Sequence, residues 1–124
     1  MRTILIADDS ITARMILKRC LEMIGLKDCR IVEAKDGQEA LEMVGAEPPD
    51  LILADLNMPR RNGEDLLQRL KESDATRAIP VVIASSSVNP VRNERLMALG
   101  AHGIVAKPVS PAGLRQALGA LAGN

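Results

Sequence analysis

Five short apolar runs recur along the chain at regular intervals, and amphipathic segments separate them. The runs cover Thr3–Ala7, Cys29–Ala34, Leu51–Ala54, Val81–Ala84 and Gly103–Ala106. Most are β-branched or aliphatic and apolar on both faces, which is typical of strands that are covered on each side of a sheet. The pattern therefore predicts five buried strands.

Between these runs, apolar residues recur at steps of three and four, which predicts helices with one buried face. The repeating positions are Ala13, Leu17, Cys20, Leu21 and Ile24, then Ala40, Leu41 and Val44, then Leu66, Leu67 and Leu70, and finally Leu114, Ala117, Leu118 and Leu121. Gly25 is a stop signal for the first helix, and Asn89-Pro90 and Ser110-Pro111 start the fourth and fifth. The alternation predicts an α/β fold: a (βα)5 doubly wound parallel sheet with helices on both faces.

Length and composition narrow the possible functions. At 124 residues, the chain is expected to form a single domain, residues 1–124, with no effector domain. Sixteen acidic residues balance sixteen Lys and Arg, and the chain has no Phe, Tyr or Trp, so we expect no nucleic-acid or membrane partner. No apolar run of about 18 residues and no signal segment occur, so a cytoplasmic location is expected. Cys20 and Cys29 lack metal-site spacing and are expected to be reduced packing residues.

Side chains able to do chemistry follow four of the predicted strands directly. The first strand ends on Asp8-Asp9, the third on Asp55, the fourth on Ser85-Ser86-Ser87 and the fifth on Lys107-Pro108. In open parallel sheets, ligands bind outside the carboxyl ends of the strands. We therefore expect these residues to lie together on one rim of the sheet.

The three carboxylates would repel one another unless a cation lay between them. Oxygen ligands without His or Cys suit Mg²⁺, or Mn²⁺, better than zinc. Three carboxylates, one divalent cation and Lys107 sum to zero charge. Such a cluster can accept a phosphoryl group, because a carboxylate is a competent nucleophile and the cations offset the phosphoryl charge.

Each of these residues also has a purely structural interpretation. Asp8-Asp9 could cap the next helix, Asp55 could form a turn, Ser85 could be an ordinary strand-end hydroxyl and Lys107 a solvated lysine. All four interpretations would have to hold together on one rim, which favours the functional one. His102, in the loop before the fifth strand, is expected to be structural or solvent-facing.

The segments ILIADDS, LILADLNMP, VVIASSS and VAKP, with EAKDGQEAL between the first two, resemble response-regulator receiver domains of two-component signalling. The resemblance implies the flavodoxin-like strand order 2-1-3-4-5. It implies that Asp55 is the phosphoacceptor and that Asp8, Asp9, Asp55 and the backbone carbonyl of Asn57 bind the metal. DDSITAR is most like the single-domain, chemotaxis-type members.

The resemblance also implies roles around the phosphoryl group. Ser85, Ser86 and Lys107 would bind it, with a cis Lys107-Pro108 peptide bond, and Asn57 and Ser87 would tune its hydrolysis. Ser86 stands where Ala or Gly is common.

Two aromatic positions of the usual switch are replaced. Ile104 is at the switch position on strand five, where many receivers carry Tyr or Phe, and Val109 stands where Phe is frequent. We therefore expect activation to move the loop Ser86–Asn89 and the fourth helix.

By the same resemblance, the phosphoryl donor is a sensor histidine kinase or a histidine phosphotransfer protein. A target protein would bind the face formed by the fourth helix, fifth strand and fifth helix, with Arg92, Arg95 and Ile104 as contacts. The domain would be no enzyme beyond catalysing its own phosphorylation and dephosphorylation.

Two alternatives stay open. A haloacid-dehalogenase-like phosphatase would want an acid where Asn57 stands. A metal-stabilised interaction module would never be phosphorylated, and stable labelling of Asp55 by a small phosphodonor would exclude it.

Overall fold

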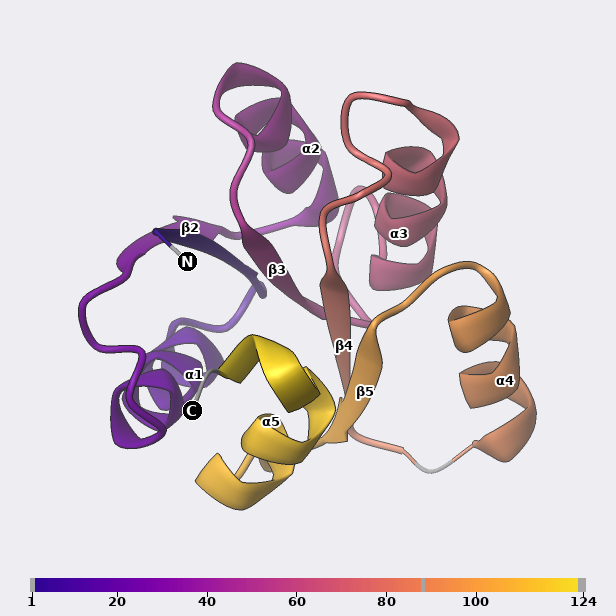
Figure 1. Ribbon diagram of the computed structural model, residues 1–124. Coiled ribbons are helices and arrows are strands. Elements are labelled where there is room, and N and C mark those ends of the chain that lie inside the picture. Colours follow the sequence, from indigo (N-terminus) through magenta and orange to yellow (C-terminus); the bar gives the residue numbers. More distant parts are fainter. Residues whose placement is uncertain (1, 88, 123–124) are drawn as a thin grey trace.

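A five-stranded parallel sheet runs through the centre of the protein, in a computed structural model that describes residues 2–87 and 89–122 (Figure 1). The strand order is β2-β1-β3-β4-β5. Along the chain the elements are β1 (Thr3–Ala7), α1 (Ile11–Met23), β2 (Arg30–Ala34), α2 (Gly37–Ala46), β3 (Leu51–Asp55), α3 (Gly63–Glu72), β4 (Val81–Ser85), α4 (Pro90–Ala98), β5 (Gly103–Ala106), α5 (Pro111–Leu118) and a 3-10 turn (Gly119–Ala122). The predicted α/β fold and its strand order are confirmed.

The helices form two layers, one on each face of the sheet, as Figure 1 shows. α1 and α5 pack on one face, with Leu17, Leu21 and Leu114 in the core. α2, α3 and α4 pack on the other, around Val44 and Leu66. The twelve largest fully buried side chains are all Ile or Leu, so the core is aliphatic, as the composition predicts.

The bounds of β1 and β5 are as predicted, and those of β2, β3 and β4 each differ from the predicted ones by one residue. β3 and β4 extend to Asp55 and Ser85, because these residues still pair in the parallel ladder with Ala84 and Ala106. Backbone pairing does not depend on side-chain polarity, so a polar residue can close a strand. β2 begins at Arg30 and is only partly buried, since it is an edge strand.

Capping residues begin all five helices. Asn89 and Ser110 accept hydrogen bonds from the amides of Arg92 and Gly113, as predicted. Ser10 caps α1, so neither Asp8 nor Asp9 does. The remaining caps are Asp36 and Asn62. The chain turns at the end of α5 through Gly119, with φ 58°, so the helix stops before the predicted Leu121.

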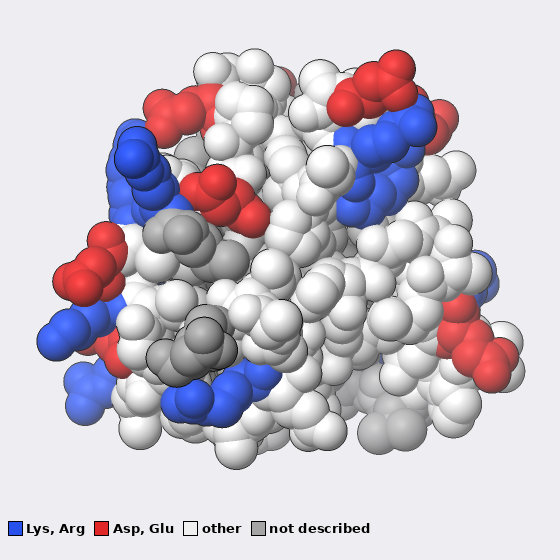
Figure 2. All heavy atoms as spheres, viewed as in Figure 1, with Lys and Arg blue, Asp and Glu red and all other residues white. Residues whose placement is uncertain are grey.

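The remaining predicted structural residues lie as expected. His102 Nε2 is 2.8 Å from the carbonyl oxygen of Leu118 and ties the start of β5 to the end of α5. Cys20 is buried, and no disulfide joins it to Cys29. On the face seen in Figure 2, acidic and basic side chains are mixed around an uncharged centre. No helix in the described ranges is long and apolar enough to cross a membrane.

Candidate functional site

Three acidic side chains meet at the carboxyl rim of the sheet. Asp8 and Asp9 follow β1, and Asp55 closes the adjacent β3. One carboxylate oxygen from each lies within 4.8 Å of the others. Asp8 and Asp55 are buried, at 0% and 7% exposed, while Asp9 faces solvent. The rim that the sequence predicts is therefore assembled in the fold.

Asp8 is fixed on several sides. Its amide donates to Ala34, which extends the β1–β2 ladder by one residue. Its Oδ1 accepts from the amide of Ser10 at 2.9 Å, and its carbonyl accepts from Arg14 Nη1 at 2.6 Å. These bonds leave Asp8 Oδ2 directed at Lys107, whose Nζ is 2.9 Å away. The side chain is therefore held in place by the backbone around it.

Lys107 bridges two of the acids. Its Nζ lies 2.9 Å from Asp8 Oδ2 and 3.2 Å from Asp55 Oδ1. Burial alone would lower the pKa of Lys107, but the hydrogen bonds and charges of the two carboxylates outweigh burial and raise it. Lys107 N–H donates to the carbonyl of Ser85, and the Lys107-Pro108 peptide bond is cis, as the resemblance implied.

Asp55 is destabilised as an anion. Burial raises the pKa of its carboxyl, and the neighbouring charge of Asp8 raises it further, although Lys107 and the backbone amide of Asn57 oppose this. A cation between the acids would relieve both effects. The donor set of hard carboxylate oxygens therefore fits a divalent ion of the Mg²⁺ class.

The hydroxyl predicted to bind the phosphoryl group is also at this rim. Ser85 is 4% exposed and closes β4, next to Asp55 on β3 in the sheet. Its Oγ donates to the carbonyl of Ser87 at 3.1 Å and accepts from Arg92 Nη2 at 2.9 Å. Ser86, Ser87 and, after β3, Asn57 are exposed.

The loop between β3 and α3 is held in place by contacts with the starts of α3 and α2. A Cβ on Gly63 would lie 2.5 Å from the carbonyl oxygen of Asp55, so only glycine permits this approach. On the other side, Arg60 Nε pairs with Asp36 Oδ2 at 2.9 Å. The backbone that carries Asp55 and Asn57 is therefore constrained from two helices.

The predicted target-binding residues lie in different environments. Arg95 is exposed and pairs with Glu64 of α3 at 2.7 Å. Ile104 is partly buried against the α2–α4 core. Arg92, by contrast, is partly buried and turns its guanidinium onto Ser85 and Ser87. Sequence spacing did not reveal this contact, nor that of Arg14, because each joins residues from different elements.

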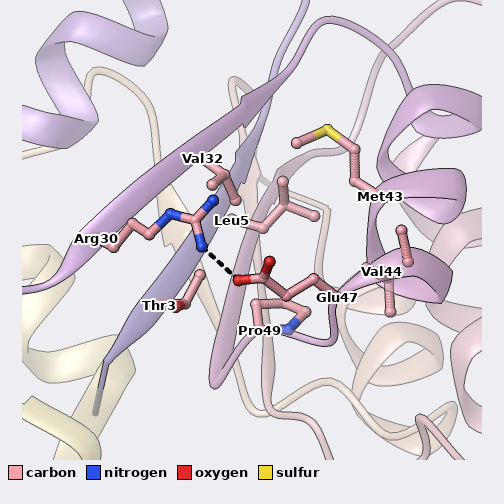
Figure 3. A pocket seen from close by; sticks show the side chains of 9 residues that line it. Thr3, Leu5, Arg30, Val32, Met43, Val44, Glu47 and Pro49 are labelled. Carbon is pink, nitrogen blue, oxygen red and sulfur yellow. Dashed lines mark hydrogen bonds and ion pairs between the residues drawn. The ribbon is translucent and has the colours of Figure 1, made fainter.

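A separate hollow lies at the opposite end of the sheet. Thr3 and Arg30, the first residues of β1 and β2, line it together with Met43 and Val44 of α2 (Figure 3). Arg30 also forms an ion pair with Glu47, another of the lining residues. Among the described residues, the acidic cluster of Asp8, Asp9 and Asp55 shares no residue with the lining of this hollow.

Known proteins support an assignment for the rim. The response regulator receiver domain family matches residues 4–119. A probable chemotaxis protein CheY of Rhizobium etli is 29% identical over 120 residues, which are 97% of this chain and 92% of that protein. Two-component response regulator ORR7 of Oryza sativa subsp. japonica is 37% identical over 110 residues, 88% of this chain and 51% of that protein. The chain thus spans about half the length of that rice relative.

A solved structure of the same class superposes over almost the whole chain. The chemotaxis response regulator CheY4 of Vibrio cholerae is 28% identical, covers 95% of this chain with 96% of its own, and has a TM-score of 0.82. Family membership decides against the haloacid-dehalogenase alternative. With its acidic rim assembled, the chain belongs to the response regulator receiver domains and is a phosphoacceptor domain of two-component signalling.

Proposed function

We propose that Asp55 is the phosphoacceptor and that a partner phosphohistidine supplies its phosphoryl group. A carboxylate oxygen of Asp55 would form the bond to phosphorus while the bond between phosphorus and the donor nitrogen breaks. The electron pair of that broken bond stays with the donor imidazole. The observation that supports this most is the buried carboxylate of Asp55, in contact with Lys107 and within 4.8 Å of two further acids.

Asp8, Asp9, Asp55 and the backbone carbonyl of Asn57 would hold Mg²⁺, with Mn²⁺ as a possible substitute. When bound, the ion supplies charge neutralisation to the incoming phosphoryl group. Asp8 is oriented for this role by the Ser10 amide. Lys107 is joined to Asp8 Oδ2 by one hydrogen bond, so the lysine can turn from Asp8 to the phosphoryl oxygens.

Lys107, Ser85 and Ser86 would bind the phosphoryl oxygens. Ser85 closes β4 and Lys107 follows β5, so the backbone of both lies on the side of β3 opposite to β1, which Asp8 follows. Charge-assisted hydrogen bonds of this kind are roughly twice as strong as neutral ones. Through these contacts the domain would promote its own phosphorylation.

A partner helical surface would dock beside the rim on α1. Ile11 and Met15 are 67% and 60% exposed and follow Asp9 by two and six residues. Met15 also lines a hollow between α1 and the start of α5, together with Ile16, Met23 and Pro111. A sensor histidine kinase or a histidine phosphotransfer protein must bring its phosphohistidine to Asp55, and this surface borders that approach.

The output face would comprise α4, β5 and α5, where a target protein binds. Val91 and Met97 of α4 are exposed apolar side chains, at 75% and 48%. Arg95 lies on the same helix with its guanidinium at the surface. Exposed apolar side chains with an arginine beside them are common at protein-binding sites.

The test is labelling by acetyl phosphate in the presence of Mg²⁺. We expect the intact mass to rise by one base-labile phosphoryl group, and peptide mapping to locate this group on Asp55. Asp55→Asn should abolish the labelling, and chelation of the metal should stop it in the wild type. Asp50→Asn, at the other end of β3, is the matched control and should label normally. Labelling of Asp55→Asn at the wild-type rate would disprove the assignment, and no stable labelling of the wild type would favour the unphosphorylated interaction module.

A further inference from the structure

An arginine from α4 contacts the rim at Ser85, and nothing in the proposed mechanism so far uses it. We propose that Arg92 is a second cationic ligand of the phosphoryl group on Asp55, beside Lys107. This inference rests on the proposed function, since it needs Asp55 to carry the phosphoryl group.

The guanidinium of Arg92 is fixed by neutral oxygens only. Its Nη2 lies 2.9 Å from Ser85 Oγ, 2.9 Å from Ser87 Oγ and 3.3 Å from the Ser87 carbonyl oxygen. Serine oxygens orient the group but leave its positive charge uncompensated. The rim therefore has a pre-positioned cation.

Within the described ranges, no carboxylate lies within ion-pair distance of Arg92. Arg95, three residues further along α4, differs because it pairs with Glu64. In addition, Arg92 Nε is buried and has no hydrogen-bond partner among the described residues. A buried donor of a charged group without a partner is costly. An anion that arrives at Ser85 would relieve this cost.

The charge of the phosphorylated rim supports the same ligand. Phosphorylation replaces the single charge of Asp55 by a phosphoryl dianion. Together with Asp8 and Asp9, this gives four negative charges against three positive charges from one divalent cation and Lys107. One negative charge is left over, and Arg92 would neutralise it.

The hydrogen bonds of Ser85 permit the rearrangement. To bind a phosphoryl oxygen, the Ser85 hydroxyl must turn its proton away from the Ser87 carbonyl, which it now contacts at 3.1 Å. Arg92 also donates to that carbonyl, so the carbonyl keeps a donor. A phosphoryl oxygen would then lie about 2.7 Å from Ser85 Oγ. The phosphoryl oxygen and Arg92 Nη2 would then both be neighbours of Ser85 Oγ. At that separation their opposite charges attract.

The experiment measures the affinity of the Mg²⁺-loaded protein for beryllofluoride, a non-covalent phosphoryl analogue, by NMR titration. Arg92→Gln should bind it about tenfold more weakly, because one charge-assisted hydrogen bond is lost. Arg92→Lys keeps the charge and should recover part of the loss. Arg115→Gln removes a cation from an exposed position on α5 and should stay close to the wild type.

Three outcomes would overturn the inference. Equal affinities for Arg92→Gln and Arg115→Gln would show that Arg92 is no ligand. Tighter binding by Arg92→Gln would show that Arg92 instead competes for Ser85. A wild type that binds no beryllofluoride would overturn the proposed function itself, so the two failures are distinguishable. Mg²⁺ affinity without beryllofluoride and the midpoint of urea unfolding should be unchanged in Arg92→Gln, which separates ligand loss from misfolding.

Discussion

Asp36 is a buried carboxylate outside the rim, and it ties together α2 and the loop that follows β3. Its Oδ1 accepts from the amide of Glu39 at 2.7 Å, and its Oδ2 pairs with Arg60. The hydrogen bond from the Glu39 amide, and then Arg60, lower the pKa of Asp36, although burial opposes them. Asp36→Ala removes both the helix cap and the ion pair and should lower the free energy of unfolding by about 1–2 kcal/mol.

The pH dependence follows from the direction of that shift. A carboxyl with a lowered pKa in the folded state stabilises the fold above its unfolded pKa of about 3.9, and the stabilisation is lost as the pH falls through the folded value. Asp36→Asn, which keeps a capping side chain, should therefore be less stable than the wild type at neutral pH. Urea denaturation should find this gap closing in acid, and a gap independent of pH would contradict the assignment.

We propose that the Ser87 side chain controls the access of water to the phosphoryl group. Both it and Asn57 are exposed, small and polar, so neither shields the rim from water. We expect a short-lived phosphoprotein. Ser87→Leu should lengthen the lifetime severalfold, because a bulky apolar group excludes hydrolytic water. Decay of the labelled protein after removal of the phosphodonor measures this, and Ser86→Leu is the neighbouring control. Identical decay of the wild type and Ser87→Leu would contradict the prediction.

The rim residues could be predicted from the sequence, but the residues that hold them in place could not. Asp8, Asp55 and Lys107 could be predicted because each lies at a strand end, and parallel strands bring such ends together. Arg14, Arg92 and the glycine at 63 act through contacts between elements, and no spacing along the chain encodes such contacts.

At the scale of elements, α2 contains two glycines in opposite situations. A Cβ at Gly37 would lie 2.0 Å from the carbonyl oxygen of Arg61, whereas a Cβ at Gly45 would meet nothing within 4 Å. Gly37→Ala should therefore destabilise the protein by about 1–3 kcal/mol through a backbone clash. Gly45→Ala should stabilise it by about 0.5–1 kcal/mol, because alanine favours the helix. Urea denaturation of both variants tests this, and changes of the same sign would contradict the close packing of α2 on the β3–α3 loop.

Element boundaries were predicted less accurately than element types. The apolar run suggested that strand two begins at Cys29, yet β2 begins at Arg30 and is exposed at the sheet edge. The leucine pattern predicted that helix five extends to Leu121. Instead, the chain turns at Gly119 and continues as a 3-10 segment. The apolar pattern of a sequence indicates which residues face the core. The backbone geometry that ends a strand or helix produces no comparable pattern in the sequence, so the ends are harder to predict.

At the scale of the whole molecule, we expect activation to pass from Ser85 to the α4 face without an aromatic switch. Ile104 is β-branched and stiff at χ1, so it cannot exchange between two distant positions. The loop Ser86–Asn89, of which Val88 lies outside the described residues, and α4 should then carry the change. In this mechanism Ser85 would supply the difference in interaction between the two states.

Ser85→Ala should therefore uncouple phosphorylation from amide shifts over residues 86–92, whereas Ile104→Ala should retain most of them. Two-dimensional NMR of beryllofluoride-bound and free protein measures both. Loss of the shifts in Ile104→Ala together with their retention in Ser85→Ala would contradict this mechanism.

The aliphatic core has a consequence for how such motions can be observed. Because the twelve largest fully buried side chains are all Ile or Leu and the chain has no Phe, Tyr or Trp, the imidazole of His102 is the one ring whose current can shift its methyl resonances. Methyl spectra should be narrow in dispersion, and any displaced methyl peak would report a changed rotamer or backbone angle directly. A single introduced tryptophan would, in turn, be the sole source of intrinsic fluorescence, because the chain has no Trp, Tyr or Phe of its own.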